Sequence, residues 1–443
     1  ELFAEIIRLS TVEGVNPFSS NDTAKSIWQK FLEVADSYNE PHRFTTLAGF
    51  EWTSTPKGDN LHRVVMFADD AEKTSQIVPF SMFDSEDPED LWAFLARYEA
   101  QTGGRAIAPA HNGNTSNGLM FDGKDFKGKK ITRAYAEARM RFEPLYEVTQ
   151  IKGDGETHPL LSPNDEFADY ERWDVSNLSG TAPKEQWMLE YEYARSALKM
   201  GLKLGDELGV NPYKFGLIGT TDSHTALATS REENYFGKYQ HTEPSPKRHG
   251  RDVIPAEDPA LRILTAQEVA SGLMAVWARE NTRQELFDAM KRKEVYATTG
   301  TRIRVRVFGG WDFAADEVFH TDFVARGYQR GVPMGGDLRK APDGKSPMFM
   351  IRSLRDPDGA NLDRVQVIKG WLDKDGKTHE RIYDVAVSGD RKPDGNGRVK
   401  EKVGSTVDVD KATYTNEIGA AVLAAHWEDP DFDPAQDAFY YVR

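Results

Sequence analysis

Five acidic or imidazole side chains stand at the ends of strand-like segments before residue 300. They are Glu51, His62, His111, Asp222 and His224. Asp222 and His224 are separated by one residue, so on an extended segment both side chains point to the same side and can reach one ion or two neighbouring ions. Mixed histidine and carboxylate sites suit zinc, manganese or iron, and can hold two metals with a bridging hydroxide. The joint placement of these residues predicts a metal centre.

Each residue also has an ordinary structural explanation. Asp222 and His224 can cap a turn, His111 can bond to its own loop, and His62 can be a histidine of the core. Their common position at strand ends favours the metal centre over these alternatives. Six further histidines lie in polar loops or in the last third of the chain, where surface or structural roles are expected: His42, His241, His249, His320, His379 and His426.

Polar residues near these positions are candidates for substrate binding. Arg63 can hold an anionic group through two hydrogen bonds, and Lys152 can do so as a point charge. Asn112 and Asn114 can hydrogen-bond to a substrate. The alternatives are salt bridges for the two cations and a satisfied tight turn for the two amides.

The segment "KGDGETHP" supplies two candidates for acid–base chemistry. Glu156 and His158 could each protonate a leaving group. Either could instead hold a metal ligand in position.

The elements that must position these residues alternate between strand-like and helix-like over residues 1–300. "RFTTLAGFEW" (43–52) and "LHRVVMF" (61–67) predict a hairpin. Residues 87–100 predict a helix, because Pro88 and acidic residues stand in the first turn. This alternation predicts an α/β fold with a parallel sheet or a barrel, in which active sites gather at the C-terminal ends of strands.

The pattern changes after residue 300. Short runs such as "TRIRVRVFGGW" and "DRVQVIKGWL" are separated by turns such as "DPDG" and "PDGNG", and no strong helix is expected between them. Residues 301–443 therefore predict a β-sandwich-like module, following a first domain over residues 1–300. This module could shape the substrate cleft, bind a polymer or form a homo-oligomer.

Composition excludes several classes of protein. The net charge is −15, with acidic and basic residues interspersed, which argues against nucleic acid as a partner. The absence of cysteine excludes disulfides, thiolate nucleophiles and cysteine-bound zinc. No apolar run approaches the roughly 18 residues of a membrane span. A soluble protein of the cytoplasm or periplasm, acting on a small-molecule substrate, is the expectation.

Long blocks of the chain resemble a known family. "FTTLAGFEWTSTPKGDNLHRVVMF", "APAHNGNTSNGLMF" and "NPYKFGLIGTTDSHT" are similar to the DUF3604 family, which resembles the PHP metallohydrolases and their carbaryl-hydrolase-like group. The resemblance implies a distorted (β/α)7 barrel with two or three metals. It matches Glu51 to the bridging glutamate, His62 and His111 to the mid-chain histidines, and Asp222 and His224 to the last Asp-x-His motif.

One motif of the PHP pattern is missing. PHP proteins begin with a His-x-His on the first strand, and this sequence contains none. The chain starts at Glu1 without methionine and stops in the strand-like "AFYYVR". These ends favour a chain cut from a longer protein, with further ligands upstream. The alternative is a degenerate metal site.

The sequence thus favours a metal-dependent hydrolase. A metal-bound hydroxide would attack a phosphoester or an ester- or carbamate-like bond of a substrate that is anionic or ester-like. The alternative is a non-catalytic ligand-binding protein with an incomplete metal site.

Overall fold

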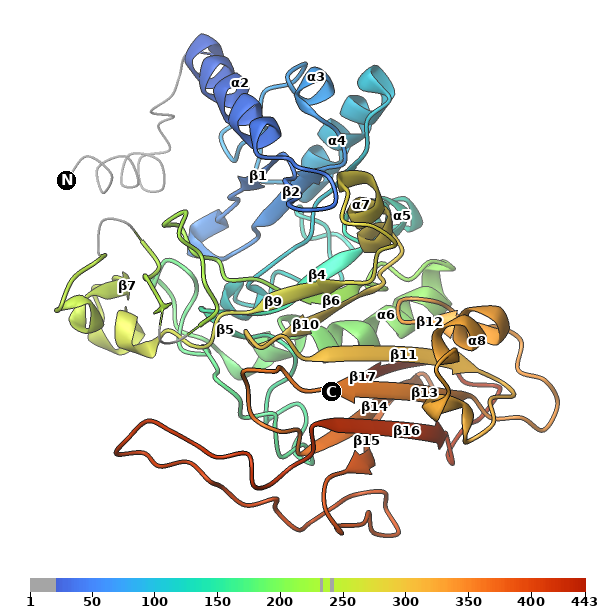
Figure 1. The fold of residues 1–443 in the computed structure, drawn as a ribbon. Coiled ribbons are helices and arrows are strands. Elements are labelled where there is room, and N and C mark those ends of the chain that lie inside the picture. The colour runs from blue at the N-terminus through green and yellow to red at the C-terminus, as the bar shows by residue number, and fades with distance from the viewer. Residues whose placement is uncertain (1–20, 232–233, 240–242) are drawn as a thin grey trace.

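Figure 1 shows the fold as a computed structural model, which describes residues 21–231, 234–239 and 243–443. These residues form a mixed α/β structure with several small sheets, and they close no barrel. Among them, no helix is long and apolar enough to cross a membrane. His241, for which a surface role is expected, lies outside the described residues.

The first sheet is antiparallel and packs against helices. Its region contains α2 (Asn21–Ser37), β1 (Gly49–Trp52), β2 (Arg63–Phe67), α3 (Ala71–Thr74), α4 (Pro88–Thr102) and β3 (Ala106–Ile107), with the strand order β1-β2-β3. The predicted hairpin is confirmed, because Glu51 lies opposite Val64. Trp52 and Phe67 are fully buried in one apolar core with residues of α2 and α4.

Helix α4 shows how the local sequence sets the ends of an element. The Asp87 side chain accepts a backbone N–H of the first turn at 3.0 Å, and Pro88 starts the helix. Gly103 follows in the left-handed conformation, with φ 62°, which glycine adopts without steric cost. The helix predicted over residues 87–100 is therefore confirmed.

A parallel strand pair lies beside the first sheet. This region contains α5 (Arg133–Phe142), β4 (Leu145–Gln150), β5 (Gly153–Asp154), the 3₁₀ helix η3 (Gln186–Tyr191), α6 (Ala194–Leu208) and β6 (Gly216–Gly219). Strand β4 pairs in parallel with β6 and antiparallel with β5. A parallel bridge between Ala110 and Tyr146 connects this sheet with the first one.

Two further antiparallel pairs complete the first three hundred residues. They involve β7 (Asp252–Ile254), β8 (Ile263–Leu264), β9 (Leu273–Val276) and β10 (Val295–Thr298), with α7 (Arg283–Lys291) before β10. Figure 1 shows β9 and β10 next to β6. The Thr282 side chain accepts the N–H of Glu285 and caps α7.

The C-terminal residues form two antiparallel sheets. The elements are β11 (Arg304–Gly310), α8 (Phe323–Arg330), β12 (Gly331–Pro333), β13 (Met348–Leu354), β14 (Arg364–Leu372), β15 (Thr378–Val387), β16 (Val422–Glu428) and β17 (Ala438–Val442). The strand orders are β12-β11-β13-β16 and β15-β14-β17. Ile351, Val367 and Ala425 come from both sheets and share one apolar cluster, so the two sheets pack against each other.

Helix α8 differs from the expectation that the C-terminal residues contain no strong helix. Its buried residues are Phe323 and Gly327. A Cβ atom at Gly327 would lie 2.3 Å from the ring of Phe308 on β11, so the missing side chain lets the helix approach the sheet. Packing of this kind stabilises a short helix, and the sequence pattern of the helix alone does not reveal it.

Candidate metal centre

Neighbouring strands of the first sheet bring together one carboxylate and two imidazoles. Glu51 lies on β1, His62 directly precedes β2, and His111 follows β3. Antiparallel pairing aligns β1 with β2, and a bridge between Arg63 and Ala110 extends the pairing to the segment of His111. Sheet pairing thus places residues that are 60 positions apart in the sequence in direct contact.

The side-chain atoms of this cluster, Glu51, His62 and His111, are close enough to share an ion. Oε1 of Glu51 lies 2.8 Å from Nδ1 of His62 and 3.0 Å from Nε2 of His111. One ligand atom from each residue lies within 4.8 Å of the others. The exposed side-chain fraction is 7% for His62 and 3% for His111, but 31% for Glu51. The cluster is therefore reached from solvent on the side of the carboxylate.

Electrostatics keep the carboxylate of the cluster ionised. Burial opposes the ionisation of Glu51, but the charge of His62 and the hydrogen bonds from both histidines outweigh it and hold its pKa well below the usual value. Burial lowers the pKa of His62. Burial acts in the same direction on His111, yet its hydrogen bond with Glu51 and the charge of Glu147 raise its pKa.

The donor set fits a divalent transition metal. Imidazole nitrogen and carboxylate oxygen are ligands that zinc, manganese and iron accept. Nε2 of His62 lies 2.9 Å from Oγ1 of Thr55, so both nitrogens of this ring have polar neighbours and its orientation is fixed. Within the described part of the chain, this cluster is the one group of three or more candidate ligands. A second or third ion would need ligands from outside the cluster.

Asp222 and His224 are held by two lysines. The Asp222 carboxylate accepts a hydrogen bond from the ammonium group of Lys152 and another from Lys238 Nζ at 2.7 Å. Lys238 Nζ also lies 2.5 Å from Nδ1 of His224. Burial opposes the ionisation of Asp222, but the two ammonium groups lower its pKa far below the usual range. Asp222 also contributes to the raised pKa of His111, so its charge acts on the cluster.

The two ammonium groups on Asp222 have opposite pKa shifts. Burial opposes the charging of Lys152, but the carboxylate of Asp222 outweighs it and raises the pKa. Burial and the charge of Lys152 lower the pKa of Lys238 to about 7. Lys152 therefore stays charged at neutral pH, and Lys238 can release a proton there.

The two asparagines that follow His111 bond to neighbouring segments of the protein. Asn112 has a left-handed φ of 49°, and its Oδ1 accepts the amide of Gln150 at 2.5 Å. Nδ2 of Asn114 donates to the backbone oxygens of Lys152 at 3.0 Å and Trp173 at 3.2 Å. Both amides therefore hold together the loops around the cluster, which is the structural alternative to substrate binding.

Arg63 lies next to His62 in sequence but points into the protein. Its Nε donates to Oε1 of Glu143 at 2.9 Å, and its guanidinium lies 6.0 Å from the ring centroid of Trp52. The side chain is 1% exposed. This arrangement gives Arg63 a buried ion pair, which is the alternative to contact with a substrate.

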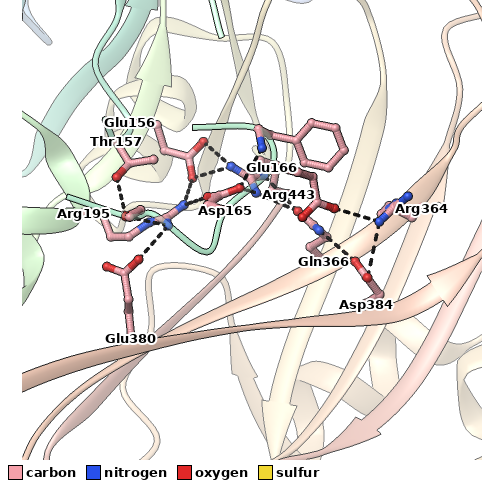
Figure 2. A network of polar contacts seen from close by, with 12 residues as sticks. Glu156, Thr157, Asp165, Glu166, Arg195, Arg364, Gln366, Glu380, Asp384 and Arg443 are labelled. Carbon is pink, nitrogen blue, oxygen red and sulfur yellow. Dashed lines mark hydrogen bonds and ion pairs between the residues drawn. The ribbon is translucent and has the colours of Figure 1, made fainter. Parts of the chain in front are cut away.

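Glu156 and His158 bond to partners outside the cluster. Figure 2 shows Glu156 in a polar network with Arg195, Asp165 and Arg443. Nε2 of His158 lies 3.0 Å from Oδ2 of Asp174. The structure thus brings together Glu51, His62 and His111 of the predicted site, places Asp222, His224 and Lys152 beside them, and gives Glu156 and His158 other partners.

Two residues near the cluster are not predicted from the sequence. Glu147 lies on β4 behind His111, and Lys238 contacts both Asp222 and His224. The signal for Glu147 is a carboxylate in the middle of a strand whose six residues are all buried, because such a charge requires a partner. Lys238 lies in a polar loop, where nothing in the sequence marks it.

Comparison with known proteins finds a family. A family model described as "Protein of unknown function (DUF3604)" matches residues 5–443. No curated protein and no solved structure matches the chain.

Proposed function

The chain belongs to the DUF3604 family, and we propose that it is a metal-dependent hydrolase of the PHP type, centred on Glu51, His62 and His111. The observation that carries the proposal is the cluster itself, with three ligand atoms within 4.8 Å of one another on strand β1 and at the ends of the neighbouring strands β2 and β3. A divalent ion in such a site lowers the pKa of a water to about 7 and so supplies a nucleophile.

The surrounding residues suit a substrate with a negative charge or a developing negative charge. The ammonium group of Lys152 bonds to Asp222, and its charge influences the pKa of Glu51's partner His62. A buried cation stabilises nearby negative charge more strongly than it would in water. In this proposal Lys152 stabilises the charge that develops on a phosphoester or on an ester- or carbamate-like bond.

The proposal includes the finer parts of the family resemblance. The sheets β1-β2-β3 and β5-β4-β6 would belong to a PHP-like distorted (β/α)7 barrel, and residues 301–443 to a β-sandwich-like module. Two or three ions of zinc, manganese or iron would bind, with Asp222 and His224 as further ligands. The bridge between Ala110 and Tyr146, which joins the two sheets, supports this arrangement.

Metal content tests the proposal directly. Plasma mass spectrometry on the chain purified without chelators should find at least about one equivalent of zinc, manganese or iron. Glu51→Gln should lose it, while Glu137→Gln, a change of an exposed glutamate in an ion pair with Arg133, should retain it. A double variant, Asp222→Ala with His224→Ala, shows whether these residues add ions to the centre.

Turnover is the second arm of this test. The metal-loaded chain should hydrolyse 4-nitrophenyl phosphate or 1-naphthyl N-methylcarbamate, and Glu51→Gln should not. A wild-type chain without metal would overturn the proposal. Metal without turnover of either substrate class would favour the ligand-binding alternative.

A further inference from the structure

A buried glutamate stands behind His111, on the side of the ring away from Glu51. Oε1 of Glu147 lies 3.8 Å from Nδ1 of His111, whereas Nε2 of the same ring lies 3.0 Å from Glu51. Glu147 is 4% exposed and His111 is 3% exposed. Within the described chain, neither Oε1 of Glu147 nor Nδ1 of His111 has a hydrogen-bond partner. Buried polar atoms without partners are rare, so two that face each other require an explanation.

The backbone and a second side chain fix this glutamate in place. The N–H of Glu147 donates to the carbonyl of Ala110 at 3.1 Å, directly before His111 in the chain. The hydroxyl of Thr220, which follows β6, donates to Oε2 of Glu147. One carboxylate oxygen is thus anchored, and the other is left to His111.

This arrangement is the one that metal-binding histidines use. A histidine that binds a metal through one nitrogen donates the N–H of the other to a carboxylate or carbonyl, which fixes the tautomer and the direction of the ring. In His111, Nε2 points into the cluster and Nδ1 points to Glu147. The separation of 3.8 Å exceeds a hydrogen bond by less than about 1 Å, so a small rotation of either side chain closes it.

We propose that Glu147 is a positioning residue of the centre, which accepts the Nδ1–H of His111 and leaves Nε2 to bind the ion. The inference rests on the proposed function for the presence of the ion, and it adds a role for Glu147 and its anchor Thr220. Glu147 is not itself a ligand in this arrangement, because it faces the nitrogen that points away from Glu51. Accordingly, the residues whose ligand atoms lie close together are Glu51, His62 and His111, and Glu147 is not among them.

Zinc affinity separates this role from a merely structural one. Zinc binding to the purified chain, measured by competition with a chelating dye, should weaken about 10- to 100-fold in Glu147→Leu. Glu147→Gln should retain most of the affinity, because its carbonyl accepts from His111 and its amide donates to Thr220. Glu192→Leu removes another buried glutamate with one unpartnered oxygen. This control should lose stability without losing zinc affinity. Equal zinc affinity in wild type and Glu147→Leu would overturn the inference.

A second measurement needs no metal and separates this inference from the proposed function. Proton NMR of the metal-free, histidine-labelled chain, at a pH where His111 carries a proton on both nitrogens, should show its Nδ1–H at low field, as for a hydrogen bond to a carboxylate. In Glu147→Leu this signal should move upfield, and it is assigned by its loss in His111→Gln. A wild-type chain that binds no zinc would end the hydrolase proposal, while the Nδ1–H signal would still report on Glu147. The same Nδ1–H chemical shift in wild type and Glu147→Leu would overturn the inference.

Discussion

Nη2 of Arg195 donates to Oε1 of Glu156 at 2.7 Å, and this ion pair lies where α6, the segment after β5 and the C-terminal strands meet (Figure 2). Arg195 also donates to Asp165 at 2.8 Å and to the hydroxyl of Tyr441 at 2.7 Å. Its side chain is 0% exposed. Residues far apart in sequence therefore share the guanidinium of Arg195, and Arg443 is a second cationic partner of Glu156 and Asp165.

Replacement of this guanidinium should destabilise the protein strongly. Arg195→Met should lower the free energy of unfolding by up to about 3–5 kcal/mol, because the buried carboxylates of Glu156 and Asp165 then keep only Arg443 as a cationic partner. Urea denaturation followed by fluorescence measures the change. Arg133→Met is the control, since Arg133 is 64% exposed in its ion pair with Glu137, and a change below about 1 kcal/mol is expected there. Equal effects of the two variants would contradict the buried role of Arg195.

Metal binding should stabilise the chain through Glu51. Zinc at about 100 times its dissociation constant should raise the free energy of unfolding by about 2.7 kcal/mol, since it binds the folded state. Thermal denaturation with and without zinc measures this as a rise in Tm. Glu51→Gln should lose the rise, and a similar rise in this variant would place the zinc elsewhere.

Stability should depend on pH through Glu192. Burial raises the pKa of Glu192 to about 7 from the ordinary value of 4.5, although the ammonium group of Lys184 opposes the shift. The folded state therefore holds this proton when the unfolded state has lost it, and stability falls as pH rises from 4.5 to about 7. This contribution amounts to roughly 3 kcal/mol.

Glu192→Gln isolates that contribution. The variant cannot ionise, so the unfolding free energy of wild type relative to the variant should decrease by roughly 3 kcal/mol from acid to neutral pH. Urea denaturation of both proteins at each pH gives the difference. A difference that does not change with pH would show that Glu192 titrates normally.

Gly153 should not tolerate a side chain. Its φ is +110°, and a Cβ atom would lie 2.9 Å from the backbone nitrogen of Trp173. Gly153→Ala should therefore lower the free energy of unfolding by more than the roughly 1–3 kcal/mol that such a backbone conformation costs alone. Gly376→Ala is the control, because Gly376 also has a positive φ but open space around its Cα. If urea denaturation shows the same loss of stability in both variants, the close approach to Trp173 adds nothing to the cost of the backbone conformation.

Local patterns in the sequence predict local structure well. The hairpin of β1 and β2 and helix α4 follow from strand-like runs, proline placement and acidic residues in the first turn, all of which act within a few positions. The same patterns do not determine which strands pair across long distances. The expected parallel sheet appears as the pair β4 and β6, while β1, β2 and β3 run antiparallel.

The candidate site shows the same limit. Glu51, His62 and His111 are identifiable because their types and strand-end positions agree with one chemistry. The role of Glu147 cannot be predicted in this way. Its carboxylate lies inside a buried strand, and its proximity to His111 becomes visible only in the folded structure. Arg63 is adjacent to a candidate ligand in sequence, but alternation along β2 turns it toward Glu143.

The segment from Lys152 to Glu156 has one end at Asp222 and the other in the network of Arg195. A span of five residues reaches at most about 17 Å, and both of its ends are pinned by buried charges. Its middle is pinned as well, because the N–H groups of Asp154 and Gly155 donate to the carbonyls of Glu171 and Val148. Such a segment opens as one unit. Its amide hydrogens should exchange with solvent at a common rate, because the segment links the network of the C-terminal strands to Asp222, beside the candidate metal centre.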